Sequence, residues 1–175
     1  MTQSLSISVE MDAESFHKFA VFDLFRHKKA WQRPLLFAII LLAAAGICLS
    51  QVGKRDGAAL LTVVLAVVAL GLPAAWFGMF FRNLKTQIRK MGLPRSFYRL
   101  ELGDTGLDVW MAGEQDKTKP SHQYPWRDLH MAYRTADAVY LYVQQNQAYL
   151  INENKDAVWA FLNDHLPADH LRDLR

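Results

Sequence analysis

Histidine and carboxylate side chains are the groups in this chain that could hold a metal ion or move a proton. None of the histidines stands in an HExxH sequence, and none is paired with cysteine at a zinc-site spacing. The tail repeats Asp-His at Asp164-His165 and Asp169-His170, a pattern that would suit a proton-active pair but is more often an exposed helix end. We therefore expect no metal and no cofactor. The six histidines are His17, His27, His122, His130, His165 and His170.

Motifs for nucleophilic or phosphate chemistry are also missing from the sequence. It has no GxSxG, P-loop or dinucleotide fingerprint, and the glycines of "LGDTGL" suit a turn rather than a phosphate cradle. Trp126 and Asp128 are the one pair with the chemistry of a partner-binding spot, although a core tryptophan and a turn-capping aspartate explain them more simply. We identify no catalytic residue and predict that the chain is not an enzyme.

Two long apolar stretches, residues 34–52 and 58–81, dominate the first half of the chain. They hold 19 and 24 residues with no charged side chain, and as helices they would reach about 28 and 36 Å against a hydrocarbon layer of roughly 30 Å. Only the Gly-Lys-Arg-Asp-Gly sequence of residues 53–57 separates them. The pattern predicts a transmembrane hairpin whose tip is this loop. Small residues recur every four positions at Ala58, Thr62 and Ala66, at Ala74 and Gly78, and at Gly46 and Ser50, which predicts the helix contact.

Basic residues flank the predicted hairpin on the side of both chain ends. By the positive-inside rule this places both termini in the cytoplasm, in a multi-pass protein of the bacterial inner membrane. Residues 82–95 carry five basic and no acidic side chains and are predicted to continue the second span as a juxtamembrane helix. We expect the bilayer itself to be a partner, through anionic lipid contacts. The residues expected to make them are Arg26, Lys28, Lys29, Arg33, Arg82, Lys85, Arg89 and Lys90.

The charge of the C-terminal part has the opposite sign. Residues 96–175 carry eight basic and twelve acidic side chains, whereas the whole chain has a net charge of +3. A nucleic-acid-binding domain would show a basic surface on the folded part itself. The distribution therefore speaks against a nucleic-acid partner.

Short strands and two helices are predicted outside the hairpin. Residues 4–11 alternate apolar and polar side chains, and a helix capped by Asp12 should follow with a phenylalanine at every third position from Phe16 to Phe25. Residues 98–111 form a predicted β-hairpin about the turn at 103–106, and further strands cover residues 129–133, 139–143 and 148–151. A helix over residues 155–166 ends before Pro167.

These elements predict an α+β membrane protein. The organisation is a strand and an amphipathic helix (residues 1–33), the hairpin (34–81), the basic helix (82–95) and an antiparallel β-rich domain with a C-terminal helix (96–175). Such an array suggests a small pleckstrin-homology-like domain, in which the strand at residues 4–11 joins the later sheet across the membrane insertion.

Three segments carry a resemblance to a known family: "YRLELGDTGLDV" (98–109), "YPWRDLHMAYRTADAVYLYV" (124–143) and "AYLINENKDAVWAFLNDHL" (148–166). With the two adjacent spans, they resemble the YcxB-like family of small bacterial membrane proteins, whose proline, tryptophan, acid, aliphatic signature matches Pro125, Trp126, Asp128 and Leu129. The family often has Pro-Lys after its last strand, where this chain has Asn152-Glu153. The resemblance implies an architecture rather than a reaction.

Three functions are compatible with these patterns. The first is a non-enzymatic inner-membrane protein that presents a cytoplasmic binding or regulatory domain to a protein partner, with a homo-oligomer also possible. The second is an immunity protein that protects against a membrane-acting toxin, and the third is an enzyme acting on membrane lipid. A pocket holding an acid or base with a perturbed pKa would favour the third.

Overall fold

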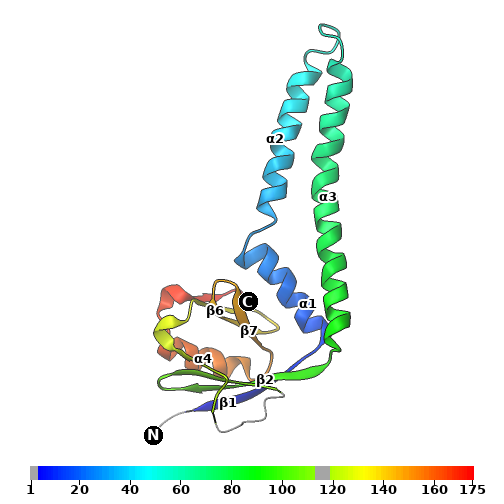
Figure 1. Cartoon of the computed structure of the whole chain (residues 1–175). Coiled ribbons are helices and arrows are strands. Elements are labelled where there is room, and N and C mark those ends of the chain that lie inside the picture. Colours follow the sequence, from blue (N-terminus) through cyan, green and yellow to red (C-terminus); the bar gives the residue numbers. More distant parts are fainter. Residues whose placement is uncertain (1–3, 113–118) are drawn as a thin grey trace. The chain divides into compact units, whose positions relative to one another are not determined.

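The computed structural model describes residues 4–112 and 119–175 (Figure 1). The predicted segments that include residues 1–3 and 113–118 extend outside this described part. The chain divides into two compact units. One is a β-sheet unit, formed by the chain up to Phe19 and again from Leu93 onward. The other is a helical unit, Ala20–Gly92, which is inserted in the sequence between these two parts.

The helical unit is built around two long helices packed as a hairpin, α2 (Gln32–Leu49) and α3 (Ala58–Met91). Both are long and apolar enough to cross a membrane. α3 is continuous through Pro73 and ends at Met91, followed by Gly92 in the left-handed conformation, whereas the basic helix was predicted to reach residue 95. The predicted first span is slightly too long, because α2 gives way to turns at Ser50. A π-helix, η1 (Asp23–His27), precedes α2.

Small side chains line the contact between α2 and α3, but not all of those predicted. Of the predicted residues, Ala58 is buried and Thr62 and Ala66 are half-buried, and Ala45 and Ala69, which were not predicted, are buried as well. Gly46 and Gly78, with their predicted neighbours Ser50 and Ala74, are instead exposed, and a Cβ added at either glycine would meet nothing within 4 Å. Their four-residue spacing is real, but it falls on faces that turn away from the partner helix.

The first sheet of the β-sheet unit joins the start of the chain to its second half. It consists of β1 (Leu5–Met11), β2 (Arg95–Gly103), β3 (Gly106–Met111) and β4 (His122–Pro125), in that spatial order and all antiparallel. β1 pairs with β2, with Ile7 opposite Leu100 and Val9 opposite Tyr98. This confirms the prediction that residues 4–11 join the sheet across the inserted hairpin.

The second sheet has the order β7-β6-β5-β8. Its strands are β5 (Met131–Arg134), β6 (Val139–Gln144), β7 (Gln147–Ile151) and β8 (Leu171–Asp173). The first three form antiparallel pairs as the sequence predicts, whereas β8 runs parallel to β5 and was not predicted. The remaining elements are the 3₁₀ turns η2 (Trp126–Asp128) and η3 (Ala168–His170) and the helix α4 (Lys155–His165).

The core of this unit lies between the sheets and under two helices. Alternating residues of β1, β2 and β3 are buried, but β6 is buried along both faces from Val139 to Val143. The second face of β6 is covered by α1 (Ala13–Phe22), whose Phe19 ring lies 5.3 Å from that of Tyr140 and 6.4 Å from that of Tyr142. Tyr140 and Tyr142 share this face of β6, and Val139, Leu141 and Val143 lie on the other, so side chains on both faces of the strand are buried.

Candidate functional site

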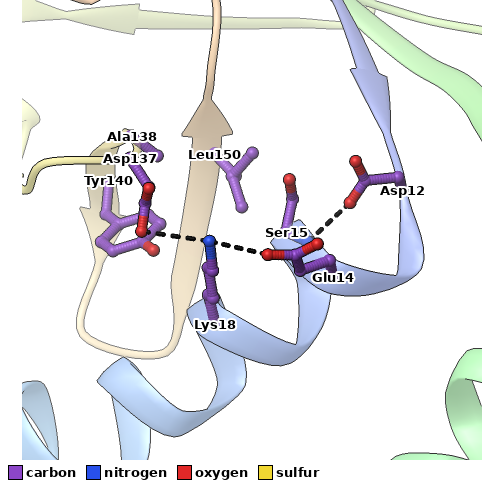
Figure 2. A pocket seen from close by; sticks show the side chains of 8 residues that line it. All are labelled: Asp12, Glu14, Ser15, Lys18, Asp137, Ala138, Tyr140 and Leu150. Atoms are coloured by element: carbon purple, nitrogen blue, oxygen red, sulfur yellow. Dashed lines mark hydrogen bonds and ion pairs between the residues drawn. The ribbon is translucent and has the colours of Figure 1, made fainter.

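A pocket of about 220 Å³ lies in the β-sheet unit, where the first turns of α1 meet the end of the β5–β6 connection (Figure 2). Its lining combines one lysine, three carboxylates, one serine, one tyrosine and two apolar side chains. The residues are Asp12, Glu14, Ser15, Lys18, Asp137, Ala138, Tyr140 and Leu150.

Lys18 is the centre of this pocket. Its Nζ lies 2.9 Å from Glu14 Oε1, one helical turn earlier, and 3.3 Å from Asp137 Oδ2 of the β5–β6 connection (Figure 2). The hydrogen bonds to Glu14 and then to Asp137 raise the pKa of Lys18 above its ordinary value. The ammonium group therefore stays protonated at neutral pH, and it links α1 to the second sheet by charge.

Asp12 and Tyr140 form the two sides of the pocket. The Ser15 backbone N–H donates to Asp12 Oδ1 at 2.6 Å, which confirms Asp12 as the cap of α1 and lowers the pKa of its carboxyl group. Burial raises the pKa of Tyr140, which outweighs the lowering effect of its hydrogen bond with Thr135. The carboxyl group stays ionised and the phenol stays neutral.

These shifts decide what chemistry the pocket supports. A general acid or base works best with a pKa near the working pH. The pKa values of Lys18, Asp12 and Tyr140 are all shifted further away from pH 7. The three carboxylates carry more negative charge than the single ammonium group can neutralise. The pocket is therefore suited to holding a cationic group by ionic and hydrogen-bonding contacts.

Trp126 and Asp128 lie on η2, between β4 and β5. Trp126 is 9% exposed, its Nε1 donates to the Gly103 carbonyl oxygen at 2.9 Å, and its ring lies 5.3 Å from that of His165. The indole thus packs between the β2–β3 turn and α4. The Asp128 side chain is 58% exposed and 3.6 Å from Arg127 Nε. Of the two, only Asp128 has most of its side chain exposed to solvent.

The eight basic residues predicted to touch anionic lipid all belong to the helical unit and are all exposed. Arg82, Lys85, Arg89 and Lys90 follow the apolar part of α3. Arg26 and Lys29 line a second pocket, of about 360 Å³, with Phe25, Trp31 and Gln32. Lys28 is engaged differently, because its Nζ lies 2.7 Å from Asp23 Oδ2.

Arg134 is a structural centre that the sequence analysis missed. It is buried in β5, it forms ion pairs with Asp156 of α4 and with Asp173 of β8, and its guanidinium lies 5.8 Å from the Trp159 ring centroid. A single arginine in a short apolar strand was the available signal. The Lys18 pocket had a similar signal in the four-residue spacing of Glu14 and Lys18, which is typical of a helical ion pair.

The histidines remain dispersed. Within residues 4–112 and 119–175, no group of three or more His, Cys, Asp or Glu side chains is placed to hold a metal ion. His165 stacks on Phe161 with ring centroids 4.3 Å apart, and its Nδ1 lies 2.8 Å from the Phe161 carbonyl oxygen. This side chain therefore packs against Phe161 of its own helix and against Trp126.

Comparisons of the chain with protein-family models, with curated proteins and with solved structures find no match. A function for this chain therefore has to follow from its own residues and their geometry.

Proposed function

We propose that the chain is an integral membrane protein of the bacterial inner membrane, in which α2 and α3 span the bilayer and both termini are cytoplasmic. The observation that carries this proposal is the exposure of the hairpin's apolar side chains. Only 11% of the residues in the most apolar stretch of each helix are buried, whereas a core helix of a soluble protein would be mostly covered. A bilayer would cover these surfaces, and the charge-free stretches have the length that it requires.

The orientation rests on the basic residues around the hairpin. Arg33 stands at the start of α2 and Arg82 follows the apolar part of α3, so both lie at the end of the hairpin from which the two chain ends emerge. Lys54 and Arg55, in the connecting turns, are the competing positive charges. The larger number of basic residues at the open end favours a cytoplasmic location for that end.

The β-sheet unit is, on this proposal, a cytoplasmic binding or regulatory domain of the pleckstrin-homology-like and YcxB-like type. Two small sheets with a helix near the C-terminus, and β1 completing the first sheet across the insertion, support this assignment. The Lys18 pocket supports binding rather than catalysis, because the pKa shifts of Asp12, Lys18 and Tyr140 keep these three groups in their ordinary protonation states. Its excess of carboxylates favours a protein partner that contributes a lysine or an arginine.

Insertion and orientation can be tested by cysteine labelling in intact cells. In a Cys48→Ser background, a cysteine replacing Asp56 in the hairpin loop should react with a membrane-impermeant maleimide, and a cysteine replacing Asp104 in the β2–β3 turn should react only after lysis. The chain should also stay in the membrane pellet during an alkaline carbonate wash. Labelling of the Asp104 position in intact cells would refute the orientation, and release by carbonate would refute the insertion.

The binding role can be tested with charge reversals rather than with deletions, because removing residues 96–175 would also leave β1 without its partner strand. Asp137→Lys should abolish co-purification of the partner from detergent extracts. Asp104→Lys is the matched control, because it makes the same change at an exposed position of the same unit. A partner retained by Asp137→Lys, or lost equally from both variants, would contradict a role for this pocket.

A further inference from the structure

The second pocket lies in the helical unit, where η1 ends and α2 begins, and is lined by Phe25, Arg26, Lys29, Trp31 and Gln32. We propose that it is a binding site for the phosphodiester group of an anionic phospholipid. This inference rests on the proposed membrane insertion and deepens it: it replaces a diffuse attraction by eight basic residues with one headgroup site at which two cations converge.

The depth of the pocket along the hairpin fits a lipid headgroup. The Phe25 ring stacks on that of Phe77, with centroids 6.1 Å apart and an angle of 8° between the ring planes. Phe77 stands 19 residues after Ala58, the first residue of α3, which corresponds to about 28 Å of helix, close to the thickness of the hydrocarbon layer. The 18 residues of α2 give a similar length of about 27 Å from the same pocket. The pocket thus lies at the edge of the predicted hydrocarbon region.

The two basic side chains in the pocket differ from their neighbour in having no acidic partner. Within the described part of the chain, no carboxylate lies within ion-pair distance of Arg26 or Lys29, whereas Lys28 is paired with Asp23. A guanidinium group can hold two phosphate oxygens at once, and an ammonium group adds a compact charge. The combination suits a phosphodiester rather than a neutral headgroup.

The backbone holds this arrangement in place. The Lys28 and Ala30 N–H groups donate to the carbonyl oxygens of Asp23 and Leu24, at 2.8 and 3.1 Å, and Lys29 adopts a left-handed backbone conformation with φ of +48°. The Trp31 Nε1 donates to the Phe25 carbonyl oxygen at 3.1 Å, which fixes the indole over the pocket. The backbone that carries the two cations and the aromatic wall are therefore held in place before a ligand arrives.

Two further features favour a lipid over a free anion. Phe25 and Trp31, whose ring centroids are 6.3 Å apart, give the pocket an amphipathic wall of the kind that is enriched at membrane interfaces. The exposed side chains of Leu35 and Leu36 continue from it along α2, where acyl chains would lie. A free phosphate ion would use the cations but neither of these apolar surfaces.

Native mass spectrometry of the full chain in detergent, titrated with phosphatidylglycerol, tests the proposal. We expect one phosphatidylglycerol adduct that saturates, and no comparable adduct with phosphatidylcholine. The double variant Arg26→Gln/Lys29→Asn should need about thirtyfold more phosphatidylglycerol for half-saturation, if each lost cation weakens binding as a basic residue near a membrane surface does. Asparagine is chosen at residue 29 because it tolerates the left-handed backbone conformation.

Matched controls separate this site from general basic attraction. Lys85→Gln/Lys90→Gln removes the same charge from α3, and Lys28→Gln removes a neighbouring cation that is already paired. Both should bind close to wild type. An equal loss in Lys85→Gln/Lys90→Gln would overturn the proposal in favour of diffuse attraction, and displacement of the lipid by millimolar inorganic phosphate would overturn the lipid as its ligand. Retention in carbonate-washed membranes with no phosphatidylglycerol preference would refute this inference alone, whereas release by carbonate would refute the proposed function.

Discussion

The hydroxyl group of Tyr98 joins the two sheets through both backbone groups of Leu150. It donates to the Leu150 carbonyl oxygen at 2.8 Å and accepts the Leu150 N–H at 2.7 Å. Tyr98 belongs to β2 and Leu150 to β7, which is an edge strand of the second sheet. One buried phenol thus satisfies polar groups that the edge of β7 would otherwise leave without a strand partner.

Removing this hydroxyl should destabilise the β-sheet unit. Tyr98→Phe leaves a buried N–H and a buried carbonyl without that partner, and we expect the free energy of unfolding to fall by about 1–3 kcal/mol. Hydrogen-exchange mass spectrometry of peptides covering β2 and β7 would measure the change. Tyr124→Phe is the control, because its hydroxyl is only half-buried and its contacts, 3.4 Å with the Tyr149 hydroxyl and 3.3 Å with Gln147 Nε2, are longer. Equal losses in the two variants would contradict the role of the Tyr98 bridge.

The same phenol should make stability depend on pH in the alkaline range. Burial holds the pKa of Tyr98 well above its ordinary value, so the folded chain keeps the proton while the unfolded chain loses it above about pH 10. The contribution of Tyr98 to the free energy of unfolding is fully present below the pKa that this tyrosine has in the unfolded chain. Above that pKa the contribution falls as pH rises, by up to about 1.4 kcal/mol per pH unit. Urea titrations between about pH 9 and pH 11 should show a shallower decline in Tyr98→Phe than in wild type. Parallel declines would assign the effect to other groups.

Much of the β-sheet unit could be predicted from the sequence, because most strands have one buried and one open face. The alternation of Ile7 and Val9 with polar residues identified β1, and pairing with β2 followed from treating the hairpin as an insertion. β8 could not be found in this way. It has three residues, Leu171–Asp173, and its position depends on parallel pairing with β5 and on the ion pair between Arg134 and Asp173.

The Lys18 pocket shows why the candidate site was less predictable than the fold. Its local half, Asp12 with Lys18 and Glu14 on one helix, follows from capping and helical spacing. Its other half, Asp137 and Tyr140, is more than a hundred residues away and comes close only because α1 covers β6. Trp126 illustrates the converse, because its residue type is typical of interfaces while its hydrogen bond to Gly103 places it in the packed interior.

Gly106 should be intolerant of any side chain, unlike Gly103 in the same turn. A Cβ at residue 106 would collide with the carbonyl group of Tyr124 on β4, whereas one at residue 103 would meet its nearest atom at 3.9 Å. We expect Gly106→Ala to cost about 1–3 kcal/mol, since backbone must move, and Gly103→Ala to cost less. Hydrogen exchange in β3 and β4 would report the difference. Equal protection in both variants would mean that β4 gives way without cost.

The contact between α2 and α3 should be sensitive to side-chain volume at Ala69 and insensitive at the next residue. Ala69 is 0% exposed, so Ala69→Phe must push the helices apart, and we expect the hairpin to lose about 1–3 kcal/mol. Leu70 is 66% exposed, so Leu70→Phe replaces one outward-facing apolar group by another and should leave stability nearly unchanged. Unfolding of the detergent-solubilised chain, followed by loss of helical circular dichroism, compares the two. A larger loss from Leu70→Phe would place the opposite face of α3 against its partner helix.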